Sequence, residues 1–460
     1  MRMLLKSVGL AAVILSGGGA ALADGGNPID GRWDAALTTK DGTVIPFRLD
    51  LSGSDSTLKG TLYDGFHPYD GTTSATFRDG TLVLNIEHYL TTINAQLKDG
   101  QLLGNVTSQG RGQFQQFGFH AVHHVEAGDP SRSSSAPKVA GSWVVPLPAP
   151  SAKGEKAFRF IIEQHGGEIA ASILRVDGDT GSYTGAFKDG KWVLSHFDGS
   201  RPGVITVVPN ADGTLQIDQH ANRAPAAQPV SNSASAYGTD ENSPNGRNAA
   251  TLVAYREPVA VAKGLPQPED YQTHTTARDA HEPFTFSFPD DSGKLVTNED
   301  PRFKGKVVLA IVTGTWCPNC HDEAQYLVQL DKKYRDRGLA IVALDFEEPD
   351  QQGSLEREHA FVKQYGVKYT YLIAGAPEEM WEKVPQLVNL NTWPATVFIG
   401  RDGTIRGVHS GFASPASGEF NDQLKKEFTT QIEALLSEKG ISAKTTPADH
   451  AQALEVAQAN

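Results

Sequence analysis

The sequence of 460 residues is poor in cysteine and methionine, with two of the first and three of the second. The two cysteines, Cys317 and Cys320, are three positions apart, which excludes a framework of structural disulfides because a bridge across so short a loop would constrain little of the unfolded chain. After the N-terminal region, no stretch is long and apolar enough to span a bilayer. The net charge of −13 also argues against a nucleic-acid-binding protein, which usually carries a basic patch.

The N-terminus has the pattern of a secretory signal peptide over residues 1–23. Arg2 and Lys6 give a basic start, the stretch 8–15 is apolar, and small residues lead up to Ala23. An uncleaved membrane anchor is the alternative, but the apolar stretch is short for a bilayer. We therefore expect an exported, periplasmic protein. In such oxidising surroundings two isolated cysteines indicate redox chemistry rather than a structural staple.

Residues 27–258 are predicted to be all-β. Short apolar runs are separated by Asp-Gly pairs, a strong signal for hairpin turns. These pairs are Asp41-Gly42, Asp79-Gly80, Asp99-Gly100, Asp189-Gly190 and Asp212-Gly213. The region also repeats, since the motif around Trp33 returns around Trp143, and the Phe-basic-Asp-Gly turns keep the same spacing. We expect two all-β units, at 27–130 and 138–258, which are either two small barrels or two halves of one sandwich.

Three further segments are set apart by composition. The second unit carries a polar loop at 221–249, rich in Ala, Ser, Asn and Pro. Residues 259–283 contain several prolines and few apolar residues, and they are predicted to form an interdomain linker. Residues 441–460 are predicted to be a flexible tail.

Residues 284–440 alternate between strand and helix patterns, which predicts an α/β domain. The chain is thus expected to be multidomain, with this domain after the two β units. The predicted strands are 284–288, 307–312, 339–344, 369–373, 395–399 and 404–408, and the predicted helices are 318–337, 356–365, 378–387 and 421–439.

The cysteine pair lies at a junction between strand and helix. Trp316, Cys317, Pro318, Asn319 and Cys320 follow a buried strand and open a helix. A helix N-terminus presents unpaired N–H groups and a partial positive charge, so a thiol there loses its proton more easily. Proline suits the first helical turn because its missing N–H is not needed there.

This motif, with Trp393-Pro394 before the strand 395–399, resembles the TlpA/ResA-type branch of the thioredoxin superfamily, whose members are typically exported disulfide reductases. The resemblance covers residues 284–440 and implies a thioredoxin-like fold with a cis peptide bond at Pro394. It implies that Cys317 is the exposed attacking thiol and that Cys320 resolves the mixed disulfide. Substrate is then expected beside four residues around the pair. These are Trp316, Pro318, Trp393 and Pro394.

Glu323 is the third candidate catalytic residue, one helical turn after Cys320. The TlpA/ResA family carries a glutamate at this place that influences the pKa values of the cysteines. The position of the buried aspartate of thioredoxin falls on Ile311 here, so Glu323 is expected to accept the proton of Cys320. The alternative is a glutamate on a solvated helix face.

Two other chemistries remain open. The run from Cys317 to His321 also matches the attachment pattern of c-type haem, with His321 as axial ligand. A peroxiredoxin-like peroxidase would need a threonine three residues before the cysteine. Gly314 occupies that place, and Thr315 is only two residues before Cys317.

The expected reaction is reduction of disulfides in envelope proteins, and the resemblance implies a membrane thiol donor as the reductant. No cofactor, metal or nucleic acid is expected. The β units could serve instead as modules that bind a partner protein. His120, His123 and His124 would be candidate metal ligands, although scattered surface histidines are the simpler interpretation.

Overall fold

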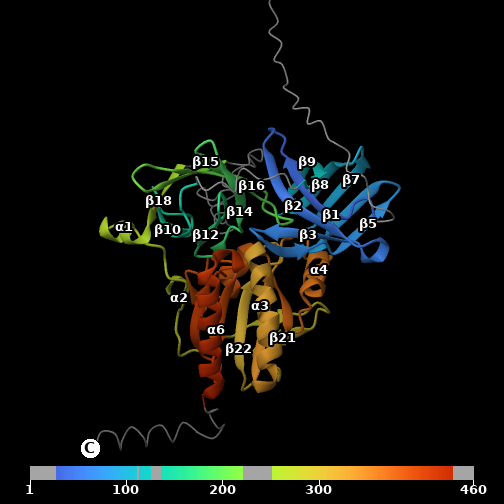
Figure 1. Ribbon diagram of the computed structural model, residues 1–460. Helices are drawn as coiled ribbons and strands as arrows, with labels where there is room; N and C mark the ends of the chain where they lie inside the picture. The colour runs from blue at the N-terminus through green and yellow to red at the C-terminus, as the bar shows by residue number, and fades with distance from the viewer. Residues whose placement is uncertain (1–26, 111–112, 126–135, 221–250, 439–460) are drawn as a thin grey trace, which may run out of the picture.

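The computed structural model describes residues 27–110, 113–125, 136–220 and 251–438. Two β units lie side by side over one end of a C-terminal α/β domain (Figure 1). The predicted signal peptide, the polar loop 221–249 and the tail 441–460 lie outside the described residues.

The first β unit is one antiparallel sheet curled into a half-barrel. Its strand order among the described residues is β4-β3-β2-β1-β9-β8-β7-β6-β5. The strands are β1 (Gly31–Thr38), β2 (Val44–Ser52), β3 (Lys59–Asp64), β4 (His67–Gly71), β5 (Ser74–Arg78), β6 (Thr81–Ile86), β7 (Thr91–Lys98), β8 (Gln101–Gly110) and β9 (Gln113–His123). Two short 3-10 helices interrupt it, η1 (Asp55–Thr57) and η2 (Glu87–Tyr89).

The second β unit is a closed barrel of eight antiparallel strands with one short additional strand. Closure comes from the pairing of β11 with β12, which joins the two ends of the sheet. The strands are β10 (Gly141–Pro146), β11 (Ala157–His165), β12 (Glu168–Arg175), β13 (Gly178–Asp179), β14 (Tyr183–Lys188), β15 (Lys191–His196), β16 (Gly203–Pro209), β17 (Leu215–His220) and β18 (Thr251–Arg256).

The predicted repeat is confirmed in the two cores. Trp33 and Trp143 are both buried, and each indole donates a hydrogen bond of 2.8 Å to a carbonyl four residues earlier, Ile29 O and Val139 O. Each unit surrounds its own apolar core, so the units are not two halves of one sandwich.

The predicted Asp-Gly turns are also confirmed, since all five pairs lie in the connections between consecutive strands. At Asp79-Gly80 the two residues have φ of 50° and 74°. A two-residue hairpin turn needs positive φ at both positions, which Asp and Gly tolerate better than other residues.

The C-terminal domain contains a five-stranded mixed sheet with the order β24-β23-β22-β26-β27. The first three strands of that order run parallel, and β26 and β27 are antiparallel to their neighbours. The main elements are β22 (Val307–Thr313), α3 (Pro318–Tyr334), η5 (Arg335–Arg337), β23 (Leu339–Phe346), α4 (Glu356–Tyr365), β24 (Thr370–Gly375), β26 (Ala395–Ile399), β27 (Ile405–Ser410), η7 (Pro415–Ser417) and α6 (Glu419–Ser437).

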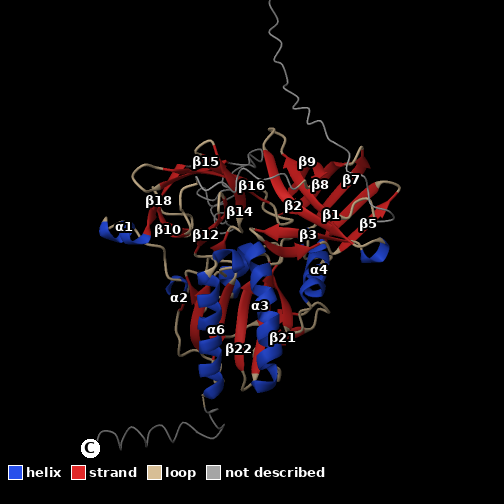
Figure 2. Ribbon diagram, in the orientation of Figure 1, coloured by secondary structure: helices blue, strands red, loops and turns tan. Residues whose placement is uncertain are grey.

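The central strand β22 is buried on both faces, which explains its unbroken apolar sequence. Leu309 and Ile311 face the side on which α3 and α6 pack, whereas Val308 and Ala310 face a second core that contains both cysteines. The N-terminal end of α3 points toward the β units (Figure 2). The redox motif therefore sits where the three parts of the molecule meet.

Two sequence predictions in this domain were wrong in extent. The predicted strand 284–288 is mostly irregular, and only β20 (Ser287–Pro289) pairs, with β21 (Leu295–Thr297). Before β20, Phe284 N donates to Gly403 O and not to a strand partner. The predicted helix 378–387 contains only η6 (Pro377–Glu379) and α5 (Met380–Lys383). Pro385 disfavours helical backbone at the residue before it, so the helix stops at Lys383.

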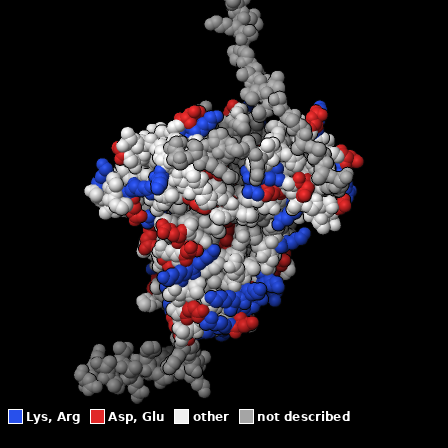
Figure 3. Space-filling view, viewed as in Figure 1, with Lys and Arg blue, Asp and Glu red and all other residues white. Residues whose placement is uncertain are grey.

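The segment between the second β unit and β20 contains three short elements. They are α1 (Glu257–Ala262), α2 (Tyr271–His274) and β19 (Thr276–Ala277), and β19 pairs with β25 (Leu387–Val388). No helix among the described residues is both long and apolar enough to cross a membrane. On the face drawn in Figure 3, acidic and basic side chains are interspersed over the β units and the C-terminal domain.

Candidate redox site

The cysteine pair is placed by the turn that joins β22 to α3. Cys317 is the N-cap of α3 with an extended backbone, and Pro318 is the first helical residue, as the sequence predicts. Cys320 N donates to Cys317 O at 3.0 Å, which closes the first turn of the helix. Both cysteines are free thiols. The first thiol therefore lies at the positive end of a helix of 17 residues.

The predicted cis peptide bond is present between Trp393 and Pro394, and it lies beside the first cysteine. The thiol of Cys317 donates to Trp393 O at 3.5 Å. The indoles of Trp316 and Trp393 meet edge to face with centroids 5.1 Å apart, and Trp316 is held by a bond from its Nε1 to Phe346 O. The structure thus places Trp316, Trp393 and Pro394, which the motif predicts to lie beside substrate, around Cys317.

Glu323 is buried, with 1% of its surface exposed, so the alternative of a solvated helix face is wrong. Thr396 Oγ1 donates to its Oε1, and its Oε2 has no hydrogen-bond partner among the described residues. Burial raises the pKa of Glu323 to about 8. The carboxyl is therefore poised to exchange a proton near neutral pH.

Burial also raises the pKa of Cys320 well above its usual value, and contact with Cys317 raises it further. Burial raises the pKa of Tyr369, and the nearby charges of Glu323 and Cys320 raise it further. Cys320 therefore needs a base if it is to react as a thiolate, and a buried carboxyl stands one helical turn away.

A buried polar cluster behind Trp316 was missed by the sequence analysis. Arg357 is 2% exposed and pairs with Glu347 and Glu348, while its Nε donates to Thr315 Oγ1 at 3.1 Å. Thr315 in turn donates its hydroxyl proton to Glu347. The available signal was the acidic residues that directly follow the strand 339–344. Their partner, Arg357, lies on helix α4, and nothing in the sequence connects the two. The cluster fixes the loop that carries Trp316.

A second acid in this region, Asp345, is fully buried at the end of β23. Burial raises its pKa well above the usual range, and the charge of Glu347 raises it further. This carboxyl lies on the strand next to the central strand, where Ile311 stands in place of an acid, and it was not predicted from the sequence.

Cys317 is not exposed as the resemblance implied, since only 4% of its surface is accessible. Cys317 packs in the core of its own domain, and the second β unit lies against the motif at Asn319. Asn319 is 7% exposed and donates from Nδ2 to Asp177 O at 2.8 Å, and Arg201 Nη1 donates to Asn319 Oδ1 at 3.2 Å. Asp177 and Arg201, which contact Asn319 from the second β unit, thus lie far upstream of the motif in the chain.

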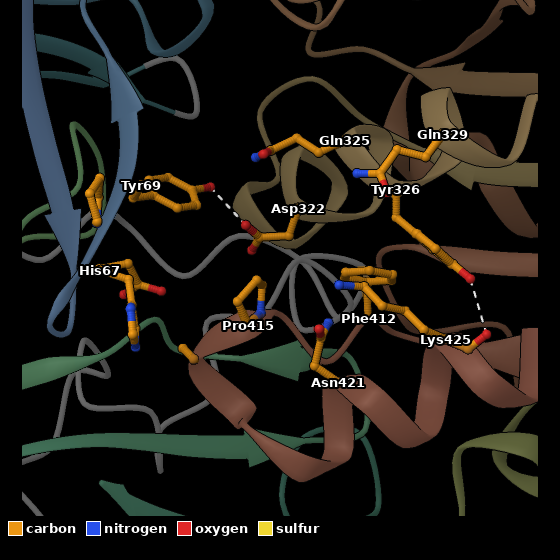
Figure 4. A pocket seen from close by; sticks show the side chains of 13 residues that line it. His67, Tyr69, Asp322, Gln325, Tyr326, Gln329, Phe412, Pro415, Asn421 and Lys425 are labelled. Carbon is orange, nitrogen blue, oxygen red and sulfur yellow. Dashed lines mark hydrogen bonds between the residues drawn. The ribbon is translucent and has the colours of Figure 1, made fainter. Parts of the chain in front are cut away.

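The first β unit contacts the same helix. Tyr69 OH donates to Asp322 Oδ1 at 2.8 Å, beside an interdomain cavity of about 150 Å³ that is also lined by Tyr326 and Lys425 (Figure 4). Burial raises the pKa of Asp322 well above its usual value. The ring of Tyr89 lies 4.3 Å from that of His321. Both β units therefore pack on the N-terminal half of α3.

His321 is fully buried, and both ring nitrogens are engaged. Nε2 lies 2.6 Å from Thr315 O and Nδ1 lies 2.9 Å from the hydroxyl of Tyr365. This arrangement does not suit an axial haem ligand, which needs a free ring nitrogen directed at the iron.

The three histidines at the end of the first β unit make other contacts. His120 faces Gln101, His123 stacks on Trp33, and His124 pairs with Asp34. Within the described part of the chain, no group of three His, Cys, Asp or Glu side chains is arranged to hold a metal ion.

Comparison with known proteins agrees with this geometry. Residues 280–408 match the AhpC/TSA family. The C-terminal domain is thioredoxin-like, as its sheet order, its helix-capping cysteine and its cis-proline also indicate. The family match begins after both β units, so it says nothing of their role.

Several relatives of the thioredoxin-like domain are named thiol–disulfide oxidoreductases. ResA from Bacillus thuringiensis (strain Al Hakam) is 32% identical over 120 residues, which are 26% of this chain and 62% of ResA. ResA from Halalkalibacterium halodurans is 26% identical over 34% of this chain and 83% of its own length. A putative thiol:disulfide interchange protein DsbE from Chlorobium tepidum is 22% identical over 35% of this chain and 99% of its own, with a TM-score of 0.28. The chain thus spans less than two thirds of the first of these relatives.

Proposed function

We propose that this protein is an exported thiol–disulfide oxidoreductase that reduces disulfides of envelope proteins through Cys317 and Cys320. The observation that carries the proposal is the position of Cys317 at the N-terminus of α3, in contact with the carbonyl of Trp393 at the cis-proline. The similarity to ResA supports the same reaction class. The β units would then bind or select the partner protein.

The reaction begins when the thiolate of Cys317 attacks one sulfur of a substrate disulfide. The substrate S–S bond breaks, a mixed disulfide forms, and the leaving sulfur takes up a proton. Cys320 then loses its proton to the carboxylate of Glu323 and attacks the sulfur of Cys317. The second substrate thiol is released, and the Cys317–Cys320 pair is left oxidised. A membrane thiol donor returns two electrons and two protons to the pair.

The signal-like residues 1–23 support export, and the proposed compartment is the periplasm. Expression of the full chain followed by fractionation tests this part. A mature N-terminus near Asp24 in the periplasmic fraction is expected, whereas an intact leader in the cytoplasm would contradict it.

Insulin-disulfide reduction with dithiothreitol as the final reductant tests the reaction. We expect Cys317→Ser to abolish turnover and Cys320→Ser to accumulate a mixed disulfide that resists release. Normal turnover by Cys317→Ser would overturn the mechanism. The reduction potential of the pair then decides the direction, because a value near that of thioredoxin marks a reductant and a much higher value marks an oxidant.

A thiol peroxidase is the second candidate, since the family match includes the AhpC/TSA name. The geometry favours it less, because the hydroxyl of Thr315 is directed to Glu347 and receives a bond from Arg357 rather than facing Cys317. Consumption of hydrogen peroxide at a rate comparable to disulfide reduction would support the peroxidase instead.

A further inference from the structure

We propose that the hairpin of residues 175–179 in the second β unit, here called the cap hairpin, determines which disulfides reach Cys317. In the docked arrangement it admits disulfides of small molecules and extended segments, and it excludes those of bulky proteins. This inference rests on the proposed function and names the substrate class of the same site. It assigns to the second β unit a role that the thioredoxin-like domain alone would not have.

The cap hairpin touches the redox motif directly. It connects β12 to β13, with Arg175 paired to Gly178 and the tip at Val176 and Asp177. The tip carbonyl of Asp177 accepts the side-chain amide of Asn319, the residue immediately before the resolving cysteine. An incoming substrate would have to pass this contact to reach the first cysteine, which is 4% exposed.

The same hairpin touches the opposite wall of the site. Gly178 forms an isolated β-bridge with Phe412, and Gly411 N donates to Pro394 O at 2.8 Å. Asp179 Oδ2 accepts bonds of 2.7 Å from both Ser414 N and Ser417 Oγ. The cap hairpin therefore joins the segment beside the cis-proline to the segment that carries the cysteines.

Two glycines allow the backbones to approach this closely. Gly178 has φ of +116°, and a Cβ there would lie 2.4 Å from Phe412 O and 2.8 Å from Asn319 Nδ2. From the other side, Gly411 has φ of +68°, and its Cβ would lie 2.4 Å from the carbonyl carbon of Asp177. Such distances are far inside van der Waals contact. Any side chain at Gly178 must therefore push the β unit away from the redox site.

The cap hairpin is fixed to its own barrel. Burial opposes ionisation of Asp177, but Arg175 and Lys153 more than offset it and hold the pKa of Asp177 at about 2. Glu155 accepts the N–H of Val176 at 2.6 Å. Because the tip is held by a buried ion pair, opening requires the second β unit to shift as a body rather than the hairpin to bend alone.

Reagents of different size provide the first test, and it does not depend on catalysis. We expect the reduced full-length protein to react with N-ethylmaleimide at Cys317 at least tenfold faster than with a maleimide carrying a 5-kDa polyethylene glycol. Gly178→Ala should bring the two rates within about threefold. Gly213→Ala is the matched control, since Gly213 also has positive φ in the same unit but no atom within 4 Å of its Cβ. It should retain the wild-type ratio.

Two substrates provide the second test. Gly178→Ala should raise insulin reduction at least fivefold and leave reduction of hydroxyethyl disulfide within twofold of wild type. If Gly178→Ala does not fold, Asp179→Ala replaces it, because it removes the bonds to Ser414 and Ser417 without adding bulk. The proposal is overturned if the wild type reacts with both maleimides at equal rates. It is also overturned if a folded variant reacts with both maleimides but reduces insulin at the wild-type rate. A size-dependent maleimide reaction without turnover of any disulfide would refute the proposed function alone.

Discussion

Thr396 on β26 donates its hydroxyl proton to Glu323 on α3, so that a carboxyl one helical turn from Cys320 is held inside the domain. The second carboxyl oxygen of Glu323 has no partner among the described residues, and burial raises the pKa of this group to about 8. A buried acid with one free oxygen costs stability when it ionises. Its position one helical turn from Cys320 supports the proposed role in proton transfer.

The first prediction concerns stability against pH. Because the pKa of Glu323 is about 8 in the folded protein and its ordinary value is 4.5, the folded state holds more protons than the unfolded state between these two values. Its contribution to stability is full below pH 4.5 and is lost as pH rises through 8, by on the order of 5 kcal/mol. Glu323→Gln should therefore flatten the fall in thermal midpoint between pH 5 and pH 9. The exposed Glu356→Gln is the control, and an unchanged slope in Glu323→Gln would refute the assignment.

The second prediction concerns the resolving step. Without the carboxylate of Glu323, Cys320 lacks a proton acceptor, and general bases of this kind contribute about 10²- to 10⁴-fold. Glu323→Gln should slow insulin reduction at pH 7 at least tenfold and lengthen the life of the mixed disulfide, measured by acid quenching and non-reducing electrophoresis. Slower formation of the mixed disulfide with unchanged resolution would place Glu323 at a different step.

The third prediction compares the two β units. Trp33→Phe and Trp143→Phe each leave a buried carbonyl without its donor, at Ile29 and at Val139, which costs about 1–3 kcal/mol. Thermal or urea unfolding of each variant should show losses of similar size, because the two indoles occupy equivalent places. A large loss in one unit and none in the other would argue against equivalent roles for the two tryptophans.

The fourth prediction concerns the cluster behind Trp316. Arg357→Met leaves Glu347 buried without its cation, and such changes destabilise by about 3–5 kcal/mol. Arg337→Met is the matched control, since its pair with Glu433 is exposed to solvent and should contribute far less to stability than the buried pair. Urea unfolding measures both, and equal effects would mean that the buried cluster has no special role in fixing the Trp316 loop.

Much of this protein is determined by short-range patterns that the sequence displays directly. The Asp-Gly pairs place hairpin turns because only a few residues tolerate positive φ, and the apolar run at 307–312 is a central strand because both of its faces must be buried. Cys317 at a strand-to-helix junction was sufficient to predict a redox site, and the family resemblance of the motif around Pro394 implied the cis-proline. These features depend on neighbours in the chain.

Other features depend on residues that are distant in the chain, and only the tertiary structure decided them. The sequence left open whether Glu323 is solvated, and the structure shows it buried with a bond from Thr396. Nothing in the sequence indicated that Arg357 would contact Glu347 and Thr315. Most decisive is Asp177, which lies 142 positions from Asn319 and yet holds its side chain. The sequence alone predicted a redox pair. Only the tertiary structure showed that the second β unit packs against the motif at Asn319, because that contact joins residues far apart in the chain.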